Sequence, residues 1–484
     1  MNTRIALMLV TFAAGCATAP PVDAPRLAAD VPDAWTAVAE DLPDPVPADW
    51  WTAFEDAGLS DAVSTALESN YDLQAAAARL EQAAADARSA AAGLRPTVQA
   101  SYNGLRRKQN FVGFPIPGAE GRVLSTVFTN HGTSLDLSWE VDLWRRLRAD
   151  AQAALADLQT SAADLRGAQL SLAGQTVKVW FAIAEAQQQV LLSETTVESF
   201  RGSADLVRER FESGIRPALD LRLALLNLAN AEALLDQRRQ QLDSSRRQLD
   251  VLVGRYASGE VQPPDSLPAV PESIPGGLPA TLVARRPDLV AAERRVAAAD
   301  ARLSSARRQL LPGITLTAAT GTATDALLSL LSGDFAIWSF VGNVVAPLWQ
   351  GGRLRAQISR AEAQAAEVLA SYVNTALTAY AEVETALAAD AFYADRVRHL
   401  ETAVEQARAA ERLAEERYLA GLDIYITVLE SQRSAVQAEG DLIAARRLRL
   451  DNRVDLYLAL GGGFEQLPAP VTLGDSGAGA AGAQ

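Results

Sequence analysis

The sequence predicts a fold of long α-helices joined to amphipathic β-strands of the transmembrane type, with the whole arrangement present twice in one chain. Three observations support this fold class. The two halves share residues in the same order, each half has a long stretch without proline, and alternating segments precede these stretches. Alanine and leucine interleaved with arginine, glutamate, aspartate and glutamine form the composition that long helices favour.

The internal repeat begins near the start of each half. Residues 70–96 align with residues 286–312, and both segments read as Ala-rich helices that end at a proline, which disfavours helix at the residue before it. Further matches follow in chain order and pair residues 143–144 with 348–349, 209–214 with 416–421, and 249–254 with 456–461. Ordered matches over the whole chain indicate a duplicated unit.

Alternating segments follow each proline. We expect strands at about residues 97–107, 133–144, 313–322 and 335–349. Apolar side chains occupy every second position from Leu135 to Leu143, and this span of about ten residues is typical of a tilted transmembrane strand. A soluble, half-buried edge strand would also alternate. Trp144 and Trp349 beside the strands favour the membrane interpretation, because tryptophan is enriched at the bilayer interface.

Two very long helices are expected after the strands. Residues 148–213 and 355–420 contain no proline, and helices of that length would extend roughly 100 Å. Gly214 and Gly421 follow directly and are predicted to end the helices as C′ residues at the helix turns. Shorter helices then return at about 219–252 and 424–460. Such helices must pack on neighbours as in a coiled coil, because a single one cannot bury its apolar stripe.

The first residues resemble the signal of a bacterial lipoprotein. Residues 1–15 combine an early arginine with a short apolar run and small residues, and Cys16 is the only cysteine of the chain. The resemblance implies cleavage before Cys16, covalent lipid on that residue, and delivery to the outer membrane because Ala17 follows it. We expect residues 16–47 to be a Pro-rich tether and residues 467–484 a disordered tail. The two repeats then span 48–265 and 266–466.

Several function classes are disfavoured. The net charge of −15 argues against a nucleic-acid surface. His131 and His399 lie far apart with no cysteine partner after Cys16, so a metal site is not expected. No catalytic motif is recognisable, and we predict neither an enzyme nor a cofactor beyond the covalent lipid.

The chain from Trp50 to Gly463 resembles the TolC/OprM/NodT group of outer-membrane efflux proteins. Its most specific features are the duplicated helix–strand–strand–helix halves, the cysteine signal, and residues 347–353 and 417–433. The resemblance implies a homotrimer in which four strands per subunit close a twelve-stranded barrel, continued by an α-helical tunnel. It also implies a passive export conduit in the outer membrane, lipid-anchored and largely periplasmic, with a periplasmic adaptor and an inner-membrane transporter of the RND type as partners.

The same resemblance implies a periplasmic gate at the second helix turn. Carried over position by position, its residues are Tyr418, Ile426, Glu430 and Arg433. Glu430 stands where the family usually has aspartate. Glu430 and Arg433 are three residues apart and therefore share a helix face, where an ordinary exposed ion pair worth a few tenths of a kcal/mol is the simpler interpretation. The first half has Leu223 and Leu226 instead, so an ion pair can form only in the second half.

Two alternatives and one motif remain open. A lipid-anchored periplasmic adaptor would also have long helical hairpins, although it would lack repeated amphipathic strands. A structural coiled-coil lipoprotein would have no strands at all. Arg106, Arg107 and Lys108 form a basic run at the end of the first expected strand. This run fits either contacts with lipopolysaccharide phosphates at the cell surface or a solvated loop base.

Overall fold

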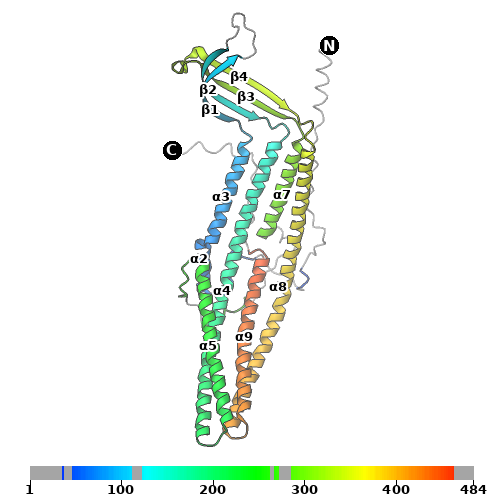
Figure 1. Ribbon diagram of the computed structural model, residues 1–484. Helices are drawn as coiled ribbons and strands as arrows, with labels where there is room; N and C mark the ends of the chain where they lie inside the picture. Colours follow the sequence, from blue (N-terminus) through cyan, green and yellow to red (C-terminus); the bar gives the residue numbers. More distant parts are fainter. Residues whose placement is uncertain (1–34, 38–45, 112–122, 262–265, 272–284, 463–484) are drawn as a thin grey trace, which may run out of the picture. The chain divides into compact units, whose positions relative to one another are not determined.

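The computed structural model describes residues 35–37, 46–111, 123–261, 266–271 and 285–462. The predicted signal peptide, Cys16, most of the tether and the predicted tail lie outside these residues. Both halves of the chain contain helix, two strands and two further helices (Figure 1). Among the described helices, none combines the length and apolar character that a bilayer crossing requires.

The elements follow the repeat order. The first half contains α2 (Ala57–Ser69), α3 (Tyr71–Ala92), β1 (Thr97–Phe111), β2 (Leu124–Glu140), α4 (Arg146–Glu212) and α5 (Ala218–Leu252). The second half contains α7 (Pro287–Arg308), β3 (Gly313–Thr324), β4 (Ala336–Val345), α8 (Arg353–Leu419) and α9 (Tyr425–Ala459). Single 3₁₀ turns lie at Trp50–Phe54, Leu327–Ser329 and Gly333–Phe335.

The chain forms two compact units, and each contains parts of both repeats. The strand unit comprises Glu81–Thr160 and Glu293–Ser371 with all four strands. The helical unit comprises the described parts of Leu27–Leu80, Ser161–Ala292 and Tyr372–Gln484. The repeats of the sequence are therefore not the units of the structure.

In the strand unit, one antiparallel sheet has the order β1-β2-β3-β4. The register is continuous, as in Leu135 opposite Thr320 and Thr320 opposite Trp338. Alternation and register place apolar side chains on one face, namely Val98, Ala100 and Tyr102 of β1, Leu135, Leu137 and Trp139 of β2, Ile314, Leu316 and Ala318 of β3, and Trp338, Phe340 and Val344 of β4. We call this the apolar face. The opposite face is polar in β1 from Thr97 to Asn103 and in β2 from Ser134 to Glu140.

The strand ends differ from the sequence-based expectation. The strand expected at about 133–144 is β2, which runs from Leu124 to Glu140 because it pairs with β1 as far as Phe111. It stops before Trp144 because the Asp142 carboxylate accepts hydrogen bonds from the amides of Leu147 and Arg148, each at 3.0 Å, and so caps α4. The other strands expected at about 97–107, 313–322 and 335–349 are observed as β1, β3 and β4, and β4 ends before Pro347, which cannot donate to a ladder.

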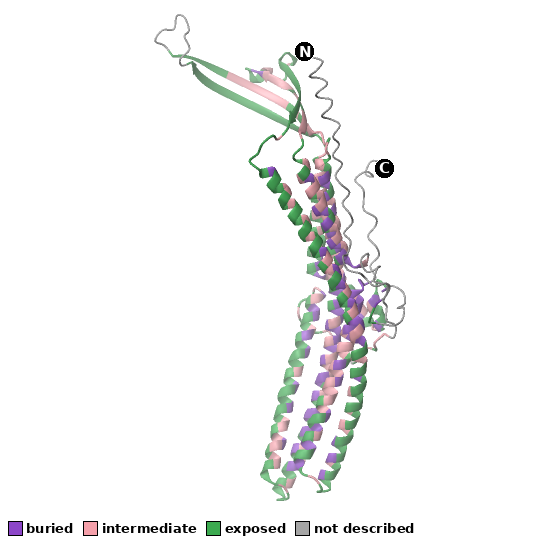
Figure 2. Ribbon diagram, turned by 90° about the vertical axis from the view of Figure 1, so that its right-hand side faces the viewer, coloured by how far each residue is buried: buried purple, intermediate pink, exposed green. Residues whose placement is uncertain are grey.

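The core of the helical unit is built mainly of alanine, valine and leucine, with a group of aromatic side chains packed among them. Trp50 stacks on Tyr457 with ring centroids 5.1 Å apart, and Phe54 meets Phe181 edge-on at the same distance. Trp50, Phe54 and Phe181 are all buried. Buried residues follow the inward faces of the helices, as the purple bands in Figure 2 show.

The two repeats make one equivalent contact in the helical unit. Asn70, just before α3, donates to the carbonyl of Leu252 at the end of α5, with Nδ2 and O 2.9 Å apart. At the matching place Arg286, just before α7, donates to the carbonyl of Ala459 at the end of α9, at 3.1 Å. Each repeat therefore fastens its first long helix to the end of its last one.

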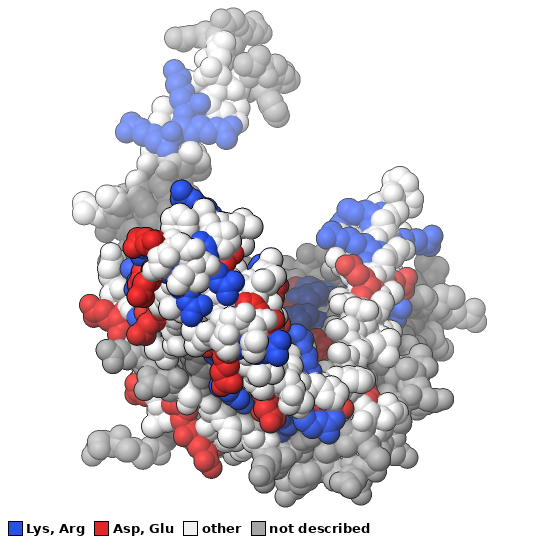
Figure 3. Space-filling view, turned by 90° about the horizontal axis from the view of Figure 1, so that it is seen from below, with Lys and Arg blue, Asp and Glu red and all other residues white. Residues whose placement is uncertain are grey.

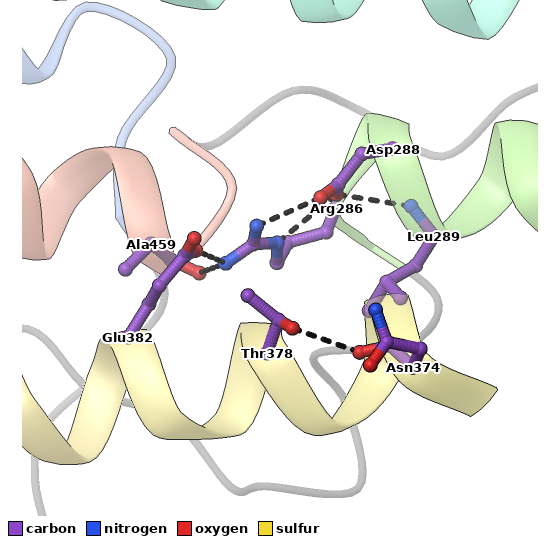
Figure 4. A network of polar contacts seen from close by, with 7 residues as sticks. All are labelled: Arg286, Asp288, Leu289, Asn374, Thr378, Glu382 and Ala459. Atoms are coloured by element: carbon purple, nitrogen blue, oxygen red, sulfur yellow. Dashed lines mark hydrogen bonds and ion pairs between the residues drawn. The ribbon is translucent and has the colours of Figure 1, made fainter. Parts of the chain in front are cut away.

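The second of these contacts belongs to a larger polar network. Arg286 forms ion pairs with Asp288, at 2.7 Å, and with Glu382 of α8, at 2.6 Å (Figure 4). Its guanidinium is almost buried, so these partners compensate its charge. Arg286 thus joins α7, α8 and α9 at one point.

Candidate functional site

The α4–α5 and α8–α9 turns lie together at one end of the helical unit, at the bottom of Figure 1. Both are built in the same way. The amide of Ile215 bonds the carbonyl of Arg210, and the amide of Leu422 bonds that of Arg417, each at 2.9 Å. Gly214 and Gly421 precede these amides with φ of 72° and 75°. This is the Schellman ending of a helix, which needs a left-handed residue and therefore favours glycine.

Tyr418 lies at the centre of the contacts between the two turns. Its side chain is only 3% exposed, and the guanidinium carbons of Arg210 and Arg216 lie 4.9 and 4.8 Å from its ring centroid. Tyr425 packs beside it with ring centroids 5.5 Å apart. Burial, followed by the nearby Tyr418 and Asp220, raises the pKa of Tyr425. Tyr418 therefore holds the two turns together through aromatic and cation–π contacts.

The other predicted gate residues lie on the exposed side of α9. Glu430 and Arg433 form an ion pair with Nη1 and Oε1 3.5 Å apart, and their side chains are 67% and 64% exposed. Ile426 is half exposed. The structure brings Glu430 and Arg433 together but places Tyr418 in the interior. At this exposure the pair contributes only a few tenths of a kcal/mol within one subunit.

Charged residues at the turns that the sequence reasoning did not select also contact one another. Arg417 and Asp423 form an ion pair across the α8–α9 turn, with Nε and Oδ2 2.5 Å apart, and the hydrogen bond from Arg417 lowers the pKa of Asp423. Arg216 donates to the carbonyl of Asp423 at 3.4 Å. The repeat gives no signal for the ion pair, because Arg210 and Arg216 flank Gly214 where Arg417 and Asp423 flank Gly421, and two arginines cannot pair.

Near the turns, α8 and α9 are joined by buried and half-buried polar side chains. Gln432 is fully buried and donates to Glu415, with Nε2 and Oε1 2.9 Å apart. Arg408 forms ion pairs with Glu411 and Glu439, and its pKa is raised chiefly by the hydrogen bond to Glu439. In the view from below in Figure 3, basic and acidic side chains are interspersed on the surface.

Comparisons with known proteins agree with this architecture. The profile of a family described as outer membrane efflux protein matches residues 62–255 and 278–462. A pyoverdine export outer membrane protein of Pseudomonas putida is 33% identical over 420 residues, which cover 86% of this chain and 88% of that protein. Outer membrane protein OprJ of Pseudomonas aeruginosa is 30% identical over 466 residues, or 95% of this chain and 96% of OprJ.

Solved structures show the same fold. The outer-membrane channel OprN superimposes with a TM-score of 0.83 at 27% identity, covering 90% of this chain and 98% of OprN. The CmeC outer membrane channel of Campylobacter jejuni gives a TM-score of 0.86 at 24% identity, covering 92% of this chain and 95% of CmeC.

Duplicated long helices and a sheet with one apolar face, in a chain that has the fold of a solved outer-membrane channel, indicate a channel protein of the outer membrane. The chain belongs to the outer membrane efflux protein family, because the family profile covers most of it. It is the outer-membrane channel component of an efflux or export pump, not an enzyme, and its long helices form a large periplasmic portion. The predicted family, fold class and function are thus confirmed.

Proposed function

We propose that three copies of the chain form one passive conduit, in which four strands from each copy close a twelve-stranded barrel and the long helices form a tunnel. The observation that carries this proposal is the sheet with an apolar face and two open edges, β1 and β4. Unpaired strand edges are not tolerated in lipid, so each edge needs a neighbouring strand. Edge-to-edge assembly of identical subunits satisfies both edges at once.

The α8–α9 turn is the gate of this conduit. Ile426, Glu430 and Arg433 are exposed on α9 and are available to neighbouring copies, so three sets would form a ring that narrows the tunnel. Tyr418 does not belong to this exposed ring. Its buried side chain stabilises the turn from the interior of the helical unit. A periplasmic adaptor opens the gate because it stabilises the state with separated helices relative to the state with the closed ring. An inner-membrane transporter of the RND type supplies the energy. The adaptor, the transporter and the lipid on Cys16 are proposed on the basis of the family resemblance.

The gate is tested by single-channel recording of the purified protein in planar bilayers. Glu430→Ala with Arg433→Ala should raise the closed-state conductance, because the ring loses its charged contacts. The matched control is Asp395→Ala with Arg398→Ala, which removes an equally spaced exposed ion pair of α8, 2.9 Å long, far from the turn in sequence. Equal conductance of the gate variant and the wild type would contradict the gate proposal and leave the channel itself in place.

A further inference from the structure

We propose that Arg106 and Lys108 form a binding site for the phosphate groups of anionic glycolipids in the outer leaflet of the outer membrane. The inference rests on the proposed function, because it requires the apolar face of the sheet to contact lipid. The conduit itself uses neither residue.

The strand register separates the three basic residues of β1. Arg106 lies opposite Thr129 and Lys108 opposite Val127 in a ladder without interruption. Because side chains alternate along a strand, Arg106 and Lys108 share the apolar face with Val98 and Tyr102. Arg107 points to the opposite face.

The apolar face changes character along β1 and β2. Val98, Ala100 and their partners Leu137 and Leu135 are apolar. Tyr102 follows and is hydrogen-bonded to His131, with Oη and Nδ1 2.9 Å apart and parallel rings. An aromatic residue with a polar tip is typical of the bilayer interface.

Arg106 and Lys108 begin four residues beyond Tyr102, which corresponds to about 13 Å along the strand. A tilt of about 40° reduces this to about 10 Å along the membrane normal. This distance along the membrane normal corresponds to the separation between an interfacial aromatic residue and the headgroup layer. The order apolar, aromatic, basic therefore matches the order acyl chain, interface, phosphate.

The carboxylates of the four described strands lie on one face only. Asp136 and Glu140 are the carboxylates of the described strands, and both lie on the face opposite Arg106 and Lys108. Glu140 is also paired with Arg146 at 2.6 Å. Arg106 and Lys108 are exposed, and within the described residues neither has an ion-pair partner.

Phosphate is the complementary ligand for this pair of cations, since arginine binds it through two parallel hydrogen bonds and lysine as a point charge. A lipid is favoured over free phosphate because the apolar face continues directly below and would contact the acyl chains of the same molecule. Two exposed cations alone would hold a free anion weakly.

The site is tested by native mass spectrometry of the detergent-solubilised full-length protein titrated with bisphosphorylated lipid A. Arg106→Gln should weaken binding about fivefold, and Arg106→Gln with Lys108→Gln about 25-fold, because each cation near an anionic lipid surface contributes about that factor. Arg107→Gln is the matched control, since it removes the same charge from the opposite face. It should change the affinity less than twofold. Lipid A without phosphates should bind all four proteins alike.

Apart from unaltered lipid A binding in the variants, three results would overturn the site. These are equal losses in Arg106→Gln and Arg107→Gln, equal binding of both forms of lipid A, and competition by millimolar inorganic phosphate, which would identify a free-phosphate site. Particle mass and conductance in neutral bilayers are measured on the same preparations. A protein that forms no channel there contradicts the proposed function and this site together, whereas a conducting trimer with unaltered lipid A binding contradicts the site alone.

Discussion

At the scale of single residues, the helix turns require glycine because of its backbone conformation, and not because a side chain would lack space. Gly421 has a φ of 75°, and a Cβ built on it would meet no atom within 4 Å. Gly421→Ala should therefore lower the free energy of unfolding by about 1 kcal/mol, the cost of a left-handed conformation for a residue with a side chain. The midpoint of thermal unfolding, followed by circular dichroism, measures the change.

Gly202 provides the opposite control. It lies inside α4 with helical backbone, and a Cβ there would also meet nothing within 4 Å. Gly202→Ala should stabilise the protein by about 1 kcal/mol, because alanine loses less conformational freedom in a helix than glycine. If both substitutions shifted the midpoint in the same direction, the conformational explanation of Gly421 would be wrong.

The sequence predicted the turn glycines Gly214 and Gly421, but it did not predict which residues surround Tyr418. The position of Tyr418 followed from the repeat and from the family resemblance. Its burial depends on Arg210 and Arg216, which belong to the other half of the chain. Such contacts between distant segments leave no periodicity in either segment, so the family resemblance groups Tyr418 with Glu430 and Arg433 without distinguishing interior from surface.

At the scale of elements, α9 packs against α4 through a row of charges around Asp451. The Asp451 carboxylate is paired with Arg447, which also contacts Glu185 of α4 at 2.5 Å. One turn further on, Asp455 is paired with Lys178 at 2.5 Å. Burial raises the pKa of Asp451 to about 6 from 3.8 and outweighs the opposing effects of Arg447 and Lys178.

This pKa predicts how the packing of α9 responds to pH. Between about pH 6 and pH 4 the folded protein binds a proton at Asp451 before the unfolded chain does, so stability rises as the pH falls through this window. The full effect corresponds to at most about 3 kcal/mol. Asp451→Asn mimics the protonated form, and the rise should be absent from it.

Unfolding midpoints of the wild type and Asp451→Asn at pH 7 and pH 4.5 measure this difference. Asp455→Asn is the control on the same helix, because Asp455 is exposed, and it should retain the rise. An equal pH response in the wild type and Asp451→Asn would show that Asp451 is not the group responsible.

Periodicity predicted the type of each element better than its ends. The alternation of β2 continues in the sequence to Leu143, yet the strand ends at Glu140 because Asp142 caps the following helix. Toward its start, β2 extends beyond the alternating segment because β1 offers a partner as far as Phe111. Both ends depend on hydrogen bonds to other segments, which a one-dimensional pattern does not contain.

At the scale of the whole molecule, the two repeats are interlocked. The sheet is continuous only because β2 of the first half pairs with β3 of the second, as in Leu135 opposite Thr320. In the helical unit, Gln189 of α4 donates to the carbonyl of Gly440 in α9 at 3.0 Å. One copy therefore completes its interior but leaves its sheet with two open edges and an exposed apolar face.

That exposed face predicts how the protein behaves without its proposed lipid. Cys16→Ser should still require detergent for extraction from membranes, because Val98, Phe340 and Val344 are more than half exposed on the apolar face of a single copy. Exposed apolar patches of this extent mark a surface that contacts lipid or protein. Light scattering of the extracted particle should give the mass of three copies.

The same measurement separates the channel from the adaptor alternative. An adaptor is held at the membrane by its lipid alone, so its Cys16→Ser variant would be recovered without detergent as a water-soluble protein. For a channel, the strands already attach the protein to the membrane, and the lipid adds to this attachment. Loss of the lipid should therefore lower the amount of protein in the membrane without changing the mass of the extracted particle. A soluble monomer would contradict the trimeric channel, and it would require another partner for the open edges of β1 and β4.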